Sequence, residues 1–217
     1  MLLLGLALVA AAGIGATKMR TTSRPAAKST ASHRIPVTCG HRAAAFREKL
    51  EPVVEAAIDR RPKRAATAAD SALAWWHRHS GSFGTQATAD SLLPAMQAAA
   101  HARRPLHAAR LAVLVSDQSF VWCPEPPTMA DQLMRIDLVG QTGWLRAHNI
   151  DLPWPDGARD AVRVVTAALR GKQRSALADS LEAYVAATLK TPVAAHRDAA
   201  PSQTLLDLVD VAEKEIP

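Results

Sequence analysis

Apolar residues fall three and four positions apart along almost the whole chain, which is the spacing of one face of a helix. The segment HRAAAFREKLEPVVEAAIDRR, residues 41–61, shows the pattern clearly. Alanine, about a fifth of the sequence, has the highest helix propensity and adds little core volume. Strands favour β-branched and aromatic residues, and aromatics are only 4% of this chain. The pattern therefore predicts an all-α protein with closely packed helices.

Breaks in this pattern divide the chain after residue 41 into seven or eight helices, joined by loops of the length usual in bundles. We expect a compact helical bundle with helices at about 41–61 (kinked or restarted at Pro52), 65–79, 89–102 (capped by Thr88), 105–115, 128–148 (capped by Thr128 and interrupted near Gly140 and Gly143), 158–169, 175–189 and from 202 onward. No fixed-period repeat is present, so a helical solenoid is not expected.

An apolar segment precedes this domain. The segment from Leu2 to Ala16 contains no charged residue. Its length of 15 residues is close to the lower limit of about 17 residues for a membrane-spanning helix. We therefore expect residues 1–17 to be a membrane anchor or export signal, 18–40 a disordered basic linker and 41–217 the helical domain. A signal peptide fits the apolar length, but it needs positive charge before its core, and here the charge follows. A third interpretation is a helix buried in the domain.

The positive charge of the chain is concentrated in that linker. The formal net charge is +6, and residues 1–40 contain no acidic residue but five basic ones, Lys18, Arg20, Arg24, Lys28 and Arg34, which leaves +1 for the other 177 residues. Such residues beside an apolar segment are expected to contact anionic lipid headgroups, each contributing about 1 kcal/mol. Nucleic-acid binding would need basic residues on the folded surface and is not expected. The positive-inside rule puts the helical domain in the cytoplasm, with export as the alternative.

The chain has two cysteines, Cys39 and Cys123, both in expected loops. In an exported protein we expect them to form a disulfide, whereas in the cytoplasm both should be reduced. Two unrelated small apolar residues are the other interpretation. No C-x-x-C motif is present, so neither a redox motif nor a zinc knuckle is expected.

Three aromatic residues form the expected partner surface. Trp75 and Trp76 are adjacent and cannot both face one side of a helix, so at least one should lie at an edge or interface, near Phe83 in the following loop. The alternative is that these rings fill gaps between helix ends.

A basic cluster in the segment DRRPKR, residues 59–64, is the other candidate contact. Arg60, Arg61, Lys63 and Arg64 surround a proline and could contact phosphate groups of lipid or nucleic acid, or could form a solvated turn.

No motif for catalysis, cofactor or metal binding is present. The chain has no G-x-S-x-G, P-loop or G-x-G-x-x-G, and no two histidines have the spacing of a helical metal site. Glu48, Glu51 and Glu55 share a helix flank, but the neighbouring Arg47 and Lys49 indicate an ordinary charged outer face. We expect no catalytic residue, cofactor or metal.

These features predict a membrane-anchored, non-enzymatic accessory or interaction subunit of a membrane-associated assembly, with lipid and protein partners. The alternatives are an exported helical binding protein with a Cys39–Cys123 disulfide, an enzyme without a known motif, and a membrane-proximal nucleic-acid binder.

Overall fold

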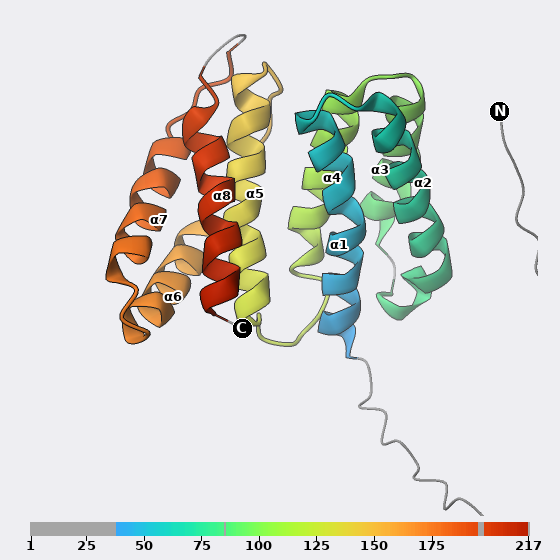
Figure 1. The fold of residues 1–217 in the computed structure, drawn as a ribbon. Coiled ribbons are helices and arrows are strands. Elements are labelled where there is room, and N and C mark those ends of the chain that lie inside the picture. Colours follow the sequence, from blue (N-terminus) through green and yellow to red (C-terminus); the bar gives the residue numbers. More distant parts are fainter. Residues whose placement is uncertain (1–37, 85, 195–197, 217) are drawn as a thin grey trace, which may run out of the picture. The chain divides into compact units, whose positions relative to one another are not determined.

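The computed structural model describes residues 38–84, 86–194 and 198–216. Over these residues the protein is all-helical, which confirms the expected fold class (Figure 1). The eight α-helices are α1 (Cys39–Ile58), α2 (Pro62–His79), α3 (Ala87–His101), α4 (Pro105–Ser119), α5 (Met129–Ala147), α6 (Ala158–Gly171), α7 (Ser175–Thr188) and α8 (Ala200–Glu215), with a 3₁₀ turn at Ser80–Ser82. The expected anchor, residues 1–17, and nearly all of the basic linker lie outside the described residues.

Capping residues and prolines mark the starts of several helices. Thr128 caps α5 as expected, because its hydroxyl accepts the N–H of Asp131 while Asp131 accepts the N–H of Thr128. The expected cap at Thr88 is wrong, since α3 begins at Ala87 after Gln86. Pro62 starts α2, so the basic cluster extends into the first turn of that helix.

Neither of two expected helix breaks is present in the described residues, since α1 does not restart at Pro52 and α5 does not stop at its glycines. Pro52 lies inside a continuous α1, whose turns on either side are anchored by buried residues such as Leu50 and Val53. Likewise α5 continues through Gly140 and Gly143. These glycines allow close helix packing, because a side chain at Gly140 would meet Leu206 and one at Gly143 would meet Thr188 and Ser202.

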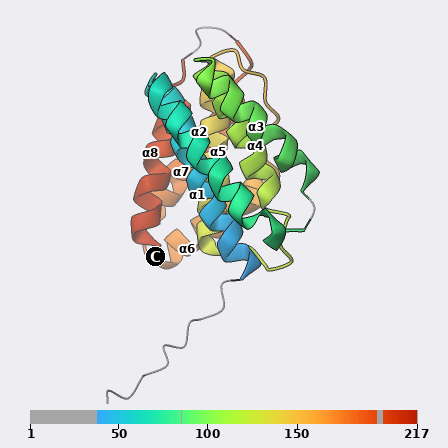
Figure 2. The same cartoon turned by 90° about the vertical axis from the view of Figure 1, so that its right-hand side faces the viewer.

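The eight helices form two four-helix halves, each with its own core. In the first half, α1–α4 enclose a core that includes Phe46, Leu93 and Met96. In the second half, α5–α8 enclose Ile136, Leu181 and Leu205. The halves lie side by side (Figures 1 and 2) and pack against each other mainly through α4 and α5. Helix α5 serves both cores, since its Leu138 and Leu145 belong to the core of the first half.

Candidate functional site

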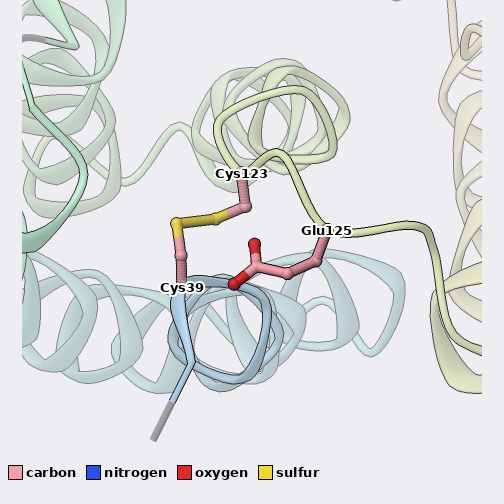
Figure 3. A group of neighbouring side chains, drawn as sticks. All are labelled: Cys39, Cys123 and Glu125. Carbon is pink, nitrogen blue, oxygen red and sulfur yellow. A yellow bond between two sulfur atoms is a disulfide. The ribbon is translucent and has the colours of Figure 1, made fainter.

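A disulfide closes the first half at the end where α1 begins, which is the lower end of α1 in Figure 1. Cys39, the first residue of α1, is bonded to Cys123 in the proline-rich loop after α4, 84 residues further along the chain (Figure 3). Thr38 caps α1 directly before Cys39, and its hydroxyl accepts the N–H of His41. The bond therefore ties the start of α1 to the segment that leads into the second half.

Glu125 lies beside this disulfide. Its carboxylate and the two sulfur atoms lie within 4.8 Å of one another, and the described residues contain no other group of three side chains that could share a metal ion. Sulfur binds metals as the thiolate. Because the two sulfurs are bonded to each other, the oxidised protein offers no thiolate here.

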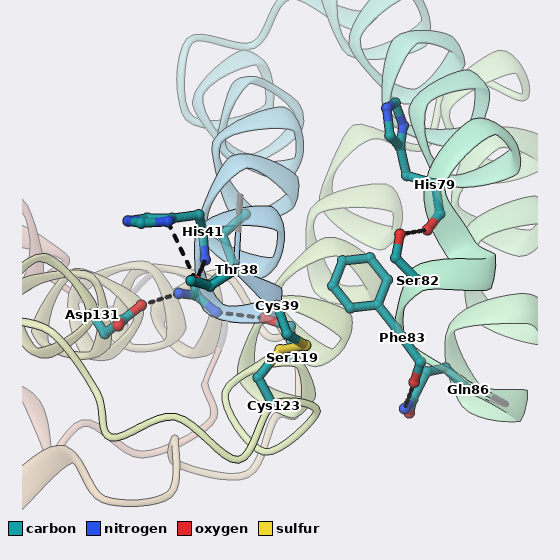
Figure 4. The surroundings of a disulfide bond; sticks show 11 residues. Thr38, Cys39, His41, His79, Ser82, Phe83, Gln86, Ser119, Cys123 and Asp131 are labelled. Carbon is teal, nitrogen blue, oxygen red and sulfur yellow. Dashed lines mark hydrogen bonds and ion pairs between the residues drawn. A yellow bond between two sulfur atoms is a disulfide. The ribbon is translucent and has the colours of Figure 1, made fainter. Parts of the chain in front are cut away.

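An aromatic cluster packs on the same end of the first half. The ring of Phe46 lies 5.1 Å from that of Trp76, 5.4 Å from that of Trp75 and 5.7 Å from that of Trp122. Phe83 stacks on Trp76 and lies on the far side of the disulfide from Asp131 in Figure 4. The indole N–H of Trp76 donates to Asp90 at 2.7 Å, so this buried ring has its polar group satisfied.

The expectation that Trp75, Trp76 and Phe83 form a partner surface is therefore not supported by their positions. Trp76 is only 2% exposed and Phe83 only 6%, while Trp75 is partly buried and stacks on His79. The physical reason is the shortage of volume in alanine-rich helices. Small residues on α1 and α2, such as Ala43, Ala69 and Ala72, leave space that the large rings fill.

A buried arginine joins the two halves. The Arg47 side chain on α1 is 3% exposed, and it pairs with Asp131 of α5 while donating to the Ser119 hydroxyl of α4 at 3.1 Å (Figure 4 shows Asp131 and Ser119). Its guanidinium also lies over the Phe120 ring, 4.1 Å from the centroid. Burial lowers the pKa of Arg47, and the charge of Asp131 opposes this. Asp131 thus caps α5 and holds α1 with the same carboxylate.

A polar hollow of the described surface lies between the two halves. It is a groove of about 410 Å³, which we call the acidic groove. Its polar lining comes from α1 (Glu51, Glu55) and its C-cap Asp59, from α2 (Arg64), from α5 (Asp137, Gln141) and from α8 (Gln203, Asp207, Asp210). A second hollow of about 290 Å³ shares Glu51, Asp137 and Asp210 and adds Glu48, Asp131 and Glu213.

The cations in this lining are already paired with acidic side chains. Arg64 lies 2.8 Å from Glu55 and 3.3 Å from Asp59, and Arg47 pairs with Asp131. Within the described part of the chain, the five carboxylates of Glu51, Asp137, Asp207, Asp210 and Glu213 form no ion pair. The groove therefore concentrates negative charge between the two halves.

This arrangement changes the acidity of three side chains. Burial raises the pKa of Asp137 well above its usual range, and the charges of Glu51, Glu213 and Asp210 add to the shift, whereas a hydrogen bond from Gln141 opposes it. The pKa of Glu51 is raised by burial and then by Glu55 and Glu213. The pKa of Glu213 is raised by burial and by Asp210. The three groups belong to three different helices.

The expectation that Glu48, Glu51 and Glu55 lie on an ordinary charged outer face is wrong for part of this face, because Arg47 is buried and Glu51 is half-buried and lines the groove. Glu48, Glu51 and Glu55 on one helix, and Asp207, Asp210 and Glu213 on another, are each spaced three or four residues apart. Each stripe alone is typical of a solvated helix face. That Glu51 would turn toward the second stripe depends on tertiary packing. Asp137 gave no signal, because it lies within an otherwise apolar stretch.

The other residues singled out from the sequence do not form a site with one another. Arg60, Arg61, Lys63 and Arg64 are all exposed, but Arg64 and Arg61 have acidic partners, Arg61 at 3.7 Å from Asp59. His77 is exposed and His79 contacts the Trp75 carbonyl. The expected lipid-contacting residues, Lys18, Arg20, Arg24, Lys28 and Arg34, lie outside the described residues.

Comparison with known proteins gives no relative. No family model, no curated protein and no solved structure matches this chain. Among the helices that the structure describes, none combines the length and apolar character needed to cross a bilayer.

Proposed function

We propose that this chain is an exported, non-enzymatic binding protein whose helical domain works outside the cytoplasm, with the N-terminal apolar segment serving as export signal or anchor. The observation that carries the proposal is the Cys39–Cys123 disulfide. Disulfides persist in oxidising compartments and are reduced in the cytoplasm. The bond also stabilises most where it closes a long loop, as it does here over 84 residues.

This proposal departs from the orientation that the basic linker favours. The positive-inside rule, applied to Lys18 through Arg34, puts the domain in the cytoplasm. A cytoplasmic domain would keep Cys39 and Cys123 as thiols and would lose the tie between α1 and the crossing loop. We give the disulfide more weight, because large domains are translocated largely regardless of charge.

The domain has a surface suited to an accessory role. Its acidic groove is a concave surface formed jointly by both halves, and it is lined by side chains from α1, α2, α5 and α8. Attachment near a membrane would raise the effective concentration of such a domain for partners at the bilayer.

The test is the redox state of the cysteines in living cells. Cells are quenched in acid, and free thiols in the denatured chain are labelled with a maleimide–polyethylene glycol that retards the protein on a gel. We expect no labelling of the full chain without a reductant and two labels after reduction. The single variants Cys39→Ser and Cys123→Ser each keep one thiol, and they calibrate one label in the absence of reductant.

Two labels on the unreduced wild-type chain would overturn the proposal and favour the cytoplasmic orientation. If the disulfide is present, a pull-down of the intact chain in mild detergent then identifies its partners. The exported-protein proposal is retained whether the partner is a membrane protein or a soluble one.

A further inference from the structure

The two halves are held together by the α4–α5 contact and by the Arg47–Asp131 pair between α1 and α5, and they face each other with acidic side chains across α1 and α8. Packing between them runs mainly through α4 and α5, and the chain crosses once, in the loop between those helices. The pairs α1–α5 and α1–α8 are not among the helix pairs that pack extensively. Instead, α1 and α8 form the two walls of the acidic groove, with α5 contributing Asp137 and Gln141. This geometry is that of a hinge at α4–α5 and an open edge at α1–α8.

The charged groups that face the open edge come from four helices. They are Arg47, Glu48, Glu51 and Glu55 of α1 with its C-cap Asp59, Arg64 of α2, Asp131 and Asp137 of α5, and Asp207, Asp210 and Glu213 of α8. Lys214 of α8 is also close enough to lower the pKa of Glu213. Arg64 is occupied by Glu55 and Asp59, and Arg47 by Asp131. Glu51, Asp137 and Asp210 line both hollows and Glu213 lines the second, and among the described residues none of these four carboxylates forms an ion pair.

We infer that the acidic groove is an acid-responsive seam, in which neutral carboxyl groups allow α1 and α8 to stay close and ionised carboxylates drive the two halves apart about the α4–α5 contact. Asp137 and Glu51 are the main contributors, because both are half-buried and gain hydration when the groove widens. Glu51, Asp210 and Glu213 add mutual repulsion across the groove, which solvent screens in part because Asp210 and Glu213 are exposed.

The sign of the response follows from the pKa directions. Raised pKa values for Glu51, Asp137 and Glu213 mean that the closed form binds more protons than a form in which these groups are solvated. The closed form is therefore favoured below the ordinary carboxyl range, near pH 4, and is lost as pH rises through the raised values. Opening would uncover groove-lining apolar residues such as Val54, Met134 and Leu206, and so create a new contact surface.

The experiment measures the α1–α8 distance directly. Spin labels are attached to Lys49→Cys on α1 and Val211→Cys on α8, both exposed positions, in the full chain, where the native cysteines are bonded and take no label. The distance between the two labels is measured by pulsed electron–electron double resonance from pH 4 to pH 8. We expect the distance distribution to shift to longer values as pH rises, with a midpoint above about 4, the ordinary carboxyl value.

Neutral isosteres test the assignment. Glu51→Gln with Asp137→Asn should keep the short distance across the whole pH range. Because those sites are partly buried, a second variant, Asp210→Asn with Glu213→Gln, changes only exposed side chains and should lower the midpoint. The matched control, Asp160→Asn with Asp179→Asn on α6 and α7, removes two exposed carboxylates outside the groove and should respond as the wild type does.

A wild-type distance that does not change with pH would overturn the inference. So would a response of both groove variants equal to that of the control variant. Neither result depends on the side of the membrane on which the domain works.

Discussion

Asp117 shows how a single carboxylate can set a pH limit on stability. It lies near the end of α4, where one of its oxygens is buried without a partner and the backbone N–H of Asp156 lies close to its carboxylate. Burial raises the pKa of Asp117 to about 6, the charge of Asp156 adds to the shift, and the hydrogen bond and Arg135 oppose it. The folded protein thus holds the proton more tightly than the unfolded chain, whose Asp117 has the ordinary pKa of 3.8.

The substitution Asp117→Asn should therefore stabilise the protein at neutral pH and have little effect at acid pH. Stability from the protonated carboxyl is fully present below about pH 4 and is lost as pH rises through about 6. Because the side chain is partly exposed, we expect a gain of about 1 kcal/mol at pH 7.5, discounted for screening by solvent. Denaturant unfolding at pH 4 and pH 7.5, followed by tryptophan fluorescence, measures it. Equal effects of the substitution at both pH values would contradict this account.

At the level of the helices, their presence could be predicted from the sequence, but the contacts between them could not. Periodicity and alanine content predicted an all-α bundle, and the Thr128 cap could be read from local chemistry. The continuity of α5 could not be predicted, because a glycine pair normally weakens a helix unless a neighbouring element packs against it. The acidic groove was missed for the same reason, since only tertiary packing turns Glu51 toward Asp210 and Glu213.

Close packing of α5 against α7 and α8 makes a prediction about its glycines. A Cβ at Gly143 would overlap the Thr188 methyl group and the Ser202 hydroxyl, whereas a Cβ at Gly171, at the end of α6, would meet no atom within 4 Å. We expect Gly143→Ala to lower the free energy of unfolding by about 1–3 kcal/mol, the usual cost of overpacking. Gly171→Ala should be neutral or stabilising by up to about 1 kcal/mol, because alanine has the higher helix propensity. Thermal unfolding of the two variants gives the comparison, and a Gly143→Ala protein as stable as wild type would show that α7 and α8 can move away without loss.

At the scale of the whole molecule, the two halves are stabilised by different means. The first half has the disulfide and the aromatic cluster around Phe46. The second half is packed from aliphatic residues, and ion pairs such as Arg170 with Glu182 lie on its surface. Between them, the Arg47–Asp131 pair ties α1 to α5. Such an arrangement allows the halves to differ in local stability, as cooperative units within one domain often do.

Reduction of the disulfide should therefore weaken the first half selectively. Both cysteines belong to segments of that half or to the loop leaving it, and the bond closes a loop of 84 residues, for which the chain-entropy model gives about 4–5 kcal/mol. Hydrogen exchange followed by mass spectrometry, with and without a phosphine reductant, measures protection helix by helix. We expect faster exchange throughout α1–α4 after reduction and little change in α6 and α7, with α5 intermediate because it serves both cores.

The Cys39→Ser, Cys123→Ser double variant should reproduce the reduced pattern and be insensitive to the reductant. Uniform loss of protection over all eight helices would mean instead that the halves unfold as one unit, with the Arg47–Asp131 pair and the α4–α5 contact strong enough to couple them fully.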